Sequence, residues 1–558
     1  MSDLRYLGDR PHVFALRALS TSTGGALSGD LAIEAGQITR GRALIEGRGG
    51  IEAVTVDSGT LAVRSWSLSA GAWSVQVACD ADGAEILRSL ERGSSLGLFV
   101  RFLDTPTSST ELMIAAGRLD RVSGMVPSMT LRVNDMAASL RHPRWDGTLF
   151  LGAKKGVLFG SLTTDELASS YTSGDATVTV VDGSGFEVVD SDTGHGADLL
   201  GIVDNSGNTF YLLWTSESLN VITLDSSVTS AGDDENAYDT DRAGASSTNV
   251  VYEYHVLWGK PWDIARKVIT STSGGTNGAY DTLIDDAGMA VPSALVASGG
   301  GVVGWNECED NIAISLGGYD IDILVTDAVD NPLSWLQGYL EPLGLVIVDS
   351  YGQVDMRAIW DPEKAPADLV RAHITDAEVV RIQTWEAYDS ATDVHYYNFD
   401  VINGTDEVGA ANYGTLNPDT SRFPLRRSKK LECPALWHKR ADGYHYEGDA
   451  GNVDDYSTYI SDEVVERIGR FYWDTPERIV LEALNGGNKR LAALVPGDIV
   501  ELTTARTGGR PSASVGQTYS QRRALVLRRQ TNWPPSGAPT VTLTLSILPV
   551  DYQEPDTL

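Results

Sequence analysis

The chain has 558 residues, of which 42% are hydrophobic, and includes 57 glycines, 13 tryptophans and 21 tyrosines. This length exceeds one hydrophobic core, so we expect about three or four domains, and the apolar content excludes a globally disordered chain. The formal net charge of −33 disfavours specific binding of DNA or RNA, because an acidic surface repels phosphate.

Residues 1–145 predict a compact β-barrel or sandwich with one helix. Period-two alternation predicts strands at 62–66 and 73–77, and ADGAEILRSL at 81–90 predicts a short helix. Further strands complete the sheet; they are expected at 96–102, 111–118 and 129–133.

Residues 146–255 differ in composition from the preceding residues and predict a β-rich insertion or hairpin domain. Asp204-Asn-Ser-Gly207 lies between two apolar runs, 200–203 and 209–214, which is typical of a β-hairpin. The polar, acidic stretch 230–248 is expected to be a loop.

Residues 256–380 predict a mixed α/β domain. A helix is expected at 262–270, and a second one begins at Pro332 and ends at Gly344. The buried side of the second helix is predicted to carry Leu333, Leu336, Tyr339 and Leu340. A hairpin of 345–348 and 354–359 follows, and a short acidic-capped helix is expected from Ile374-Thr-Asp376.

Residues 381–558 return to strands, with one long helix at 454–472. The strands are expected at 392–399, 477–484, 495–502, 524–528 and 541–548. The chain as a whole is therefore predicted to be α+β, β-rich and multidomain, with β-barrel domains at 1–145 and 381–558 that flank mixed α/β segments.

The chain has three cysteines, Cys79, Cys308 and Cys433, which are widely spaced. An odd, scattered set of this kind does not indicate a disulfide framework and favours folding in a reducing cytosol. The start MSDLRYLGDRPHVFAL has no basic region followed by an apolar one, so no secretory signal is expected. No apolar run reaches about 18 residues, so no transmembrane helix is expected.

No motif for catalysis is present: there is no phosphate-binding Gly-rich loop, H-E-x-x-H, G-x-S-x-G or paired C-x-x-C. We therefore predict that the chain is not an enzyme, and we assign no catalytic, cofactor-binding or metal residues and no cofactor. Cys433, His438 and His445 lie close in sequence, but their spacing matches no zinc pattern.

Two weaker patterns leave alternatives open. The carboxylates of Asp190, Asp192 and Asp233-Asp-Glu235 are compatible with calcium, although neither run has the twelve-residue calcium-loop spacing, and solvated loops are the simpler interpretation. A set of aromatic side chains is compatible with a platform that binds sugars, although such residues more often fill a core or a subunit interface. The set consists of Trp385, Tyr388, Tyr396, Tyr397 and Phe399.

Four segments in order resemble the hub protein at the tip of long bacteriophage tails. The first is Gly117-Arg-Leu-Asp120 with Thr130-Leu-Arg-Val133 and Asn134 to Leu140. The second is Trp262-Asp-Ile264 with Thr270-Ser-Thr272, Thr276 to Tyr280 and Val291-Pro-Ser293. The third is Leu336 to Leu345 with the Asp-Ser-Tyr-Gly turn after it, and the fourth is the C-terminal helix and strand with Val495-Pro-Gly-Asp498. Residues from roughly 160 to 250 depart from this pattern.

The resemblance implies a structural virion protein that is made in the host cytoplasm. It implies a homotrimer in which two tube-like barrels per chain adapt a six-fold tail tube to a three-fold tip and close or open the DNA channel. It also implies neighbours, namely a distal tail protein ring, the tape-measure protein and a tip or receptor-binding fibre. DNA passes through such a channel without sequence-specific binding, which an acidic wall suits.

Two other functions compete with this one. A carbohydrate-binding adhesin or depolymerase at the virion surface is motivated by the polar hairpin region 160–250. A secreted hydrolase unrelated to phage is disfavoured by the missing signal peptide and the missing nucleophile motifs.

Overall fold

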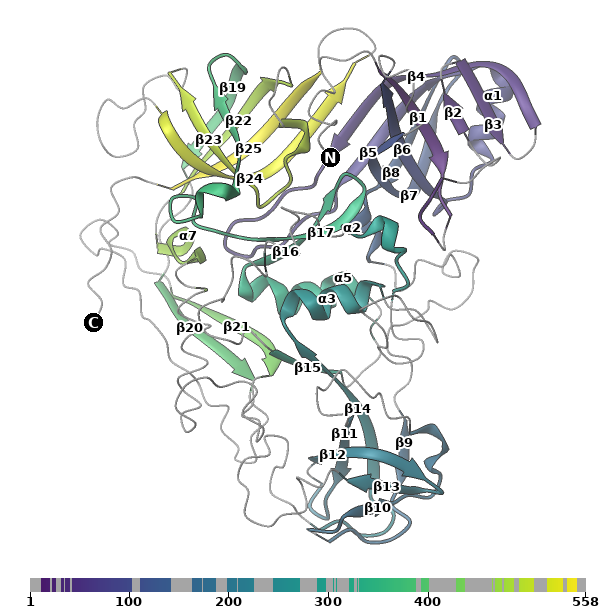
Figure 1. Cartoon of the computed structure of the whole chain (residues 1–558), viewed down its shortest axis with the longest axis vertical. Helices are drawn as coiled ribbons and strands as arrows, with labels where there is room; N and C mark the ends of the chain where they lie inside the picture. Colours follow the sequence, from purple (N-terminus) through teal and green to yellow (C-terminus); the bar gives the residue numbers. More distant parts are fainter. Residues whose placement is uncertain are drawn as a thin grey trace.

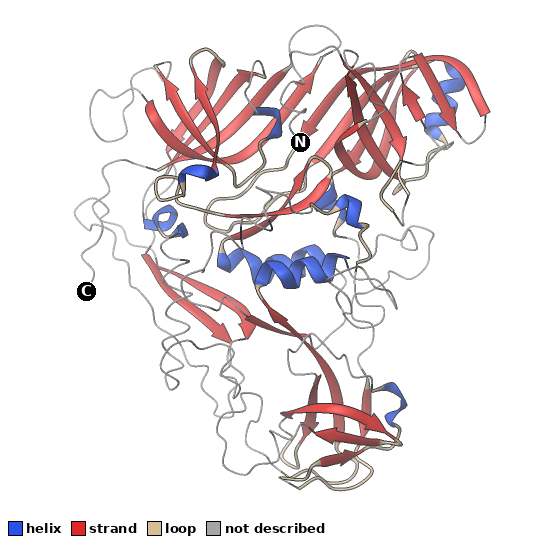
Figure 2. Cartoon of the chain, in the orientation of Figure 1, coloured by secondary structure: helices blue, strands red, loops and turns tan. Residues whose placement is uncertain are grey.

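The computed structural model is β-rich, with several antiparallel sheets and few helices in the part of the chain that it describes (Figure 2). It describes all residues except 1–11, 21–22, 27–31, 35, 41–42, 103–110, 142–162, 173, 187–197, 208, 225–243, 271–288, 298–304, 306–307, 309–320, 326–328, 330, 388–392, 401–427, 437–463, 465–466, 474–475, 486–490, 506–518, 535–538 and 549–558. Within the described residues, no helix has the length and apolar character needed to cross a membrane.

Eight strands near the N-terminus form one continuous series of antiparallel pairs, here called the N-unit. The pairing runs β4–β3–β2–β1–β6–β7–β8–β5, and β5 pairs with β4 again, so the series returns to the strand where it began. The strands are β1 (His12–Ala18), β2 (Ala32–Glu34), β3 (Gly36–Arg40), β4 (Ala43–Asp57), β5 (Ala72–Ala78), β6 (Ser95–Phe102), β7 (Leu112–Met125) and β8 (Ser128–Asn134).

The N-unit forms because its strands alternate buried and exposed residues. In β5 the side chains of Trp73, Val75 and Val77 are buried, at 1% exposure or less, while their neighbours face outward. Helix α1 (Ala81–Arg88) covers this core, and the Asp80 side chain caps it by accepting the Gly83 N–H at 2.9 Å. The strands and the helix predicted between 73 and 133 are thus confirmed.

The strand predicted at 62–66 is wrong. Residues 63–65 form a turn, and both Arg64 and Trp66 have left-handed backbone angles, with φ of +73° and +52°. The apolar alternation there reflects a loop whose tryptophan is buried in the central core, and not a pleated strand.

A second series of six strands, the C-unit, follows the order β18–β23–β24–β25–β22–β19. Only the β18–β23 pair is parallel. The strands are β18 (Val370–Thr375), β19 (Val379–Ala387), β22 (Glu477–Leu484), β23 (Ile499–Thr504), β24 (Tyr519–Trp533) and β25 (Thr540–Ile547). Their inward residues form a core of their own.

The helix predicted to begin at Ile374 is also wrong, because β18 runs through Thr375 and a turn leads directly into β19. The Asp376 carboxylate accepts from the Thr504 hydroxyl, and from the Ala505 N–H at 3.2 Å, so it joins two strands where a helix cap was expected. The strand predicted from Val495 begins only at Ile499, because Gly497 adopts φ +95° in a turn.

A separate sheet extends away from these units. Its order is β10–β13–β12–β11–β14–β15–β21–β20, with β9 on β14. Its first part, residues 163–259 and here called the distal unit, has a separate core and lies at the lower end of Figure 1. The strands are β9 (Thr164–Glu166), β10 (Thr177–Thr179), β11 (Asp198–Val203), β12 (Thr209–Ser218), β13 (Val221–Leu224), β14 (Val250–Gly259), β15 (Ile321–Val325), β20 (Asp393–Asp400) and β21 (Ser428–Leu436). The hairpin predicted around 204–207 is confirmed as β11 and β12.

A central segment lies between the units (Figure 1). It holds α3 (Pro261–Thr270), α5 (Pro332–Leu340) and the hairpin of β16 (Leu345–Ser350) and β17 (Gln353–Ala358), as predicted. Asn331 caps α5 through its side chain, Pro332 occupies the first turn, and Gly344 with φ +66° ends the segment. Leu333, Leu336 and Leu340 are buried, while Tyr339 is only partly buried.

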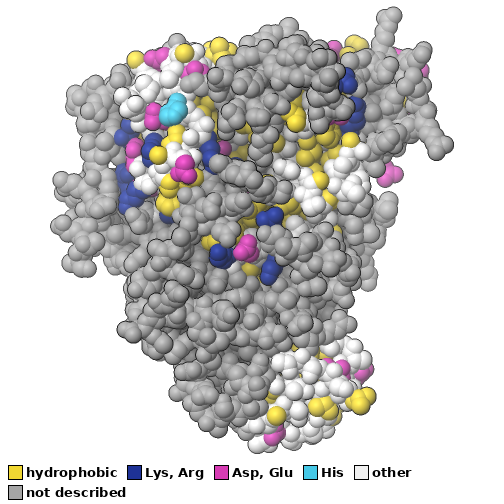
Figure 3. Space-filling model, viewed as in Figure 1, with side chains coloured by type: hydrophobic (Ala, Val, Ile, Leu, Met, Phe, Trp, Pro, Cys, Tyr) yellow, Lys and Arg dark blue, Asp and Glu magenta, His cyan; other side chains and the backbone are white. Residues whose placement is uncertain are grey.

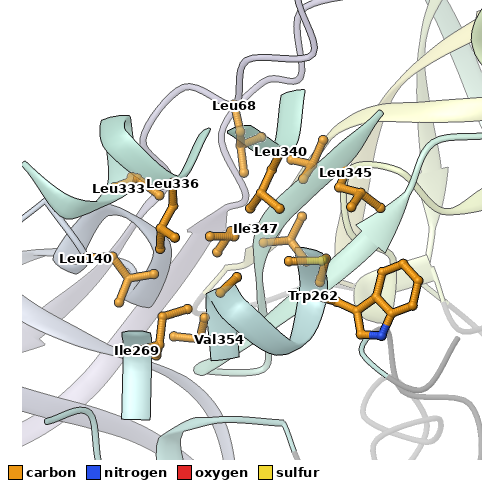
Figure 4. Close-up of a cluster of buried hydrophobic side chains, with 14 of the residues drawn as sticks. Leu68, Leu140, Trp262, Ile269, Leu333, Leu336, Leu340, Leu345, Ile347 and Val354 are labelled. Carbon is orange, nitrogen blue, oxygen red and sulfur yellow. The ribbon is translucent and has the colours of Figure 1, made fainter. Parts of the chain in front are cut away.

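The core of the central segment includes residues from the N-unit side and from the C-unit. Leu68 and Leu140 from the N-unit side meet α3, α5 and the hairpin, as Figure 4 shows, and Leu525 and Leu527 of β24 belong to the same cluster. Of the long helix predicted at 454–472, the structure describes Val464 and 467–472, and α7 (Arg470–Trp473) lies there. The rest of that prediction lies outside the described residues.

Candidate functional site: the junction of the two β units

The N-unit and the C-unit are joined into one sheet. Strand β24 pairs with the last residues of β4, in register from Gln530↔Asp57 to Trp533↔Val54. At this seam the Arg528 guanidinium donates two hydrogen bonds to the Asp57 carboxylate, from Nε to Oδ1 at 3.0 Å and from Nη2 to Oδ2. The hydrogen bonds to Asp57 raise the pKa of Arg528, which favours the charged form of the guanidinium.

The turn of the central hairpin is seated on the N-unit beside this seam. Gly352 has φ +76°, and a Cβ there would lie 2.5 Å from the Ala116 nitrogen of β7, so only glycine fits. Tyr351 packs against the N-unit core. The hairpin thus contacts β7 through its turn while its strands belong to the central core.

Two carboxylates meet where the hairpin turn reaches α2 (Met136–Ser139). Asp135 caps this helix by accepting the Ala138 N–H at 2.7 Å, and Asp349 accepts the Met136 N–H at 2.9 Å from outside. The other oxygen of Asp349 accepts the Gly352 N–H at 2.9 Å. The Oδ2 atom of Asp135 is buried and has no hydrogen-bond partner among the described residues.

This pair of acids is electrostatically unfavourable when both are ionised. Burial, followed by the neighbouring Asp349 charge, raises the pKa of Asp135 well above its ordinary value. Burial also raises the pKa of Asp349 to about 6, against the opposing effect of its two backbone hydrogen bonds and of Arg529. Asp57 further raises the pKa of Asp135, whereas Arg141 lowers it.

Arg529, next to the seam arginine, points to the other side of β24 and is buried. Burial lowers its pKa, while Tyr351, Asp349, Asp57 and Asp498 act in the opposite direction. Its Nη1 donates to the Ala492 carbonyl at 2.6 Å. The guanidinium is therefore buried near acidic groups of the N-unit, of the central hairpin and of the segment before β23.

Further buried ion pairs hold the C-unit side against the central segment. Arg357 of β17 donates to Asp355 at 2.6 Å and to Asp498 at 2.8 Å, before β23. Arg470 of α7 pairs with the fully buried Asp361 at 3.1 Å. Arg467 donates to the carbonyls of Leu343 at 2.7 Å and Ile359 at 3.0 Å. Of these contacts, the Arg357–Asp498 pair joins the central hairpin to the segment that enters β23 of the C-unit.

The structure describes few of the candidate metal-binding and sugar-binding residues that the sequence suggested. His438, His445, Asp190, Asp192 and Asp233–Glu235 lie outside the described residues, as do Tyr388 and the side chains of Cys433, Tyr396, Tyr397 and Phe399. Within the described part, no three His, Cys, Asp or Glu side chains are grouped as a metal ion requires.

Trp385 is the one aromatic candidate with a described side chain. It is partly buried against the C-unit core, and its Nε1 lies 3.3 Å from Glu477 Oε2. This placement agrees with the core interpretation for Trp385.

Sequence patterns missed the acids and arginines of the junction. The only local signal was Asp135 directly before Met-Ala-Ala-Ser, which is typical of a helix cap. Asp349 and Arg529 become partners of that site only through contacts between residues that are far apart in the chain.

Comparison with known proteins gives structural matches only. No protein-family model matches the sequence, and no curated protein matches it either. The tail protein from Neisseria meningitidis MC58 is 9% identical, with a TM-score of 0.35 over 96% of each chain. The 43 kDa tail protein of prophage MuSo2 from Shewanella oneidensis is 8% identical, with a TM-score of 0.35 over 96% of this chain and 98% of that one.

The prophage tail protein gp18 from Listeria monocytogenes EGD-e is 8% identical, with a TM-score of 0.32 over 95% of this chain and 94% of that one. The solved structures to which this chain is similar thus include tail proteins of prophages.

Proposed function

We propose that the chain is a structural subunit of a phage tail, a hub at the tail tip with no catalytic role. The observation that carries this proposal is the joining of the N-unit and the C-unit into one sheet through β24 and β4. A subunit that assembles into a ring needs two β units held edge to edge in one chain, because the angle between the two units sets the curvature of the ring.

The domain plan supports the same proposal. The pairing series of the N-unit, which returns to its first strand, and the six strands of the C-unit are compatible with two tube-like barrels at about 1–145 and 381–558. The central segment braces both units by a shared core and by buried ion pairs. In this proposal three chains provide six barrel units, which adapts a six-fold tube to a three-fold tip.

The remaining partners follow from that role. A hub of this kind contacts the distal tail protein ring, the tape-measure protein and a tip or receptor-binding fibre, and DNA passes through its channel. The net charge of −33 supports passage without binding, since like charges prevent adhesion of the duplex.

The test is negative-stain imaging of the purified full chain at high concentration, with its mass measured by sedimentation. A three-fold ring or cup with a central hole is expected. A chain that stays monomeric at high concentration, and also fails to form rings when mixed with the distal tail protein, refutes the hub.

A further inference from the structure

The distal unit presents large apolar side chains at one of its turns, here called the apolar tip. Leu219 is 92% exposed and Val181 is 57% exposed. The Asn220 side chain joins the two, because its Nδ2 donates to the Val181 carbonyl at 3.0 Å. The tip is therefore one surface built from the β12–β13 turn and the segment after β10.

Leu219 occupies its position against the preference of the backbone. Ser218 pairs with Val221, so Leu219 and Asn220 form a two-residue turn, with φ of +53° and +68°. Turns with two positive φ angles favour Asn, Asp or Gly, because a larger side chain is strained there. A leucine that is both strained and exposed contributes nothing to the stability of the isolated chain.

The tip is rigid before any partner arrives. The Gly183 N–H donates to Asn220 Oδ1 at 2.9 Å, and the Asn220 N–H donates to Glu217 Oε1 at 2.8 Å. The Val180 N–H donates to the Asn220 carbonyl at 2.9 Å. A surface held in this way loses little conformational freedom on binding, which favours affinity.

The surroundings of the tip are of one charge sign. Residues 156–241 contain 16 Asp and Glu and no Lys or Arg. Glu166, Asp182 and Glu217 lie near the tip in the described part, and the Ser184 hydrogen bonds lower the pKa of Asp182. On the face in view in Figure 3, the described surface of this lower unit shows hydrophobic, Asp and Glu side chains and no Lys or Arg.

These charges select the partner. An anionic membrane, a nucleic acid or a second copy of the same unit is repelled. We propose that the apolar tip docks into an apolar pocket, bordered by Lys and Arg, on another protein of the virion. The inference rests on the proposed function, since that role supplies virion proteins as neighbours.

The experiment places a photo-reactive benzophenone amino acid at position 219 of the full chain, in particles from the strain that encodes it. The matched control carries the same group at Ser206, in the exposed β11–β12 turn of the same unit. Position 219 is expected to cross-link to one different protein, at a peptide with Lys or Arg beside apolar residues, and position 206 is not. The yield falls several-fold between roughly 0.1 M and 1 M salt, because screening shortens from about 10 Å to 3 Å.

A second variant separates binding from folding. Leu219→Asn suits the turn, so the purified chain is expected to show slower hydrogen exchange in a peptide that covers the turn between β12 and β13, whereas a cross-link from a benzophenone at position 181 is lost when this substitution is added. Unchanged or faster exchange in that peptide overturns the argument that the leucine is kept for a partner.

Particles that contain the chain but give no cross-link at 219, a salt-insensitive one, or one to a second copy refute the docking proposal and leave the hub role standing. Absence of the chain from the particles refutes both.

Discussion

The acid pair at the hairpin turn makes the junction less stable as pH rises. Burial raises the pKa of Asp349 from the ordinary 3.8 to about 6. Between these values the folded chain binds more protons than the unfolded chain, so stability falls as pH rises through this window and levels off above it. At about 1.4 kcal/mol per pKa unit, the loss from Asp349 is about 3 kcal/mol.

The perturbation is Asp349→Asn, which removes the charge but replaces one of the two oxygens that accept the Met136 and Gly352 N–H groups by an NH2 group. The lost hydrogen bond lowers the local stability of the variant by the same amount at every pH. Only the natural chain has an acid to ionise at this position, so the stability of the variant relative to the natural chain is expected to rise by about 3 kcal/mol between pH 4 and pH 8. The difference between the two chains removes the contribution of the other carboxylates.

The assay is hydrogen exchange followed by mass spectrometry, because a multidomain chain does not unfold in a single two-state step. Peptides covering 134–141 and 345–358 contain the Met136 and Gly352 amides that bind Asp349. Asp204→Asn is the control, since that carboxylate accepts the Ser206 N–H in a surface turn of the distal unit. A difference between the two chains that stays constant from pH 4 to pH 8, or that shifts in favour of the natural chain as pH rises, would refute the reasoning.

Three further changes probe the junction and its core. Arg528→Met removes the ion pair with Asp57, and because both side chains are partly exposed the loss is about 1 kcal/mol, measured as earlier proteolysis at the β4–β24 seam. Gly352→Ala forces a Cβ to 2.5 Å from the Ala116 nitrogen at φ +76°, which costs at least ~1–2 kcal/mol and speeds hydrogen exchange in the hairpin peptide 345–358; unchanged exchange would show that the hairpin turn does not pack on β7 as described. Leu336→Ala leaves a cavity in the central core and lowers the local free energy of opening by about 2–5 kcal/mol, measured as faster hydrogen exchange in a peptide that contains α5, whereas Leu484→Ala at an exposed position has little effect.

Local patterns predicted elements wherever one segment contained the whole signal. The alternation in Trp73 to Val77 predicted a strand, and Pro332 predicted the start of a helix, because pleating and the first helical turn involve neighbouring residues only. Prediction failed at 62–66, where the tryptophan of a loop is buried in the central core. It also failed at 374–376, where the Asp376 carboxylate accepts a hydrogen bond from Thr504 in place of capping a helix. Both effects come from residues remote in sequence.

The sequence by itself determined the β-rich composition, the acidic charge and most of the strands and helices between 73 and 358. Tertiary structure alone decided the junction. Asp57 and Arg528 are 471 positions apart, and Asp135 meets Asp349 only because the hairpin turn is seated on β7. A residue's pKa, pairing and burial depend on what the fold places beside it, and such long-range neighbours leave no periodic signal in the chain.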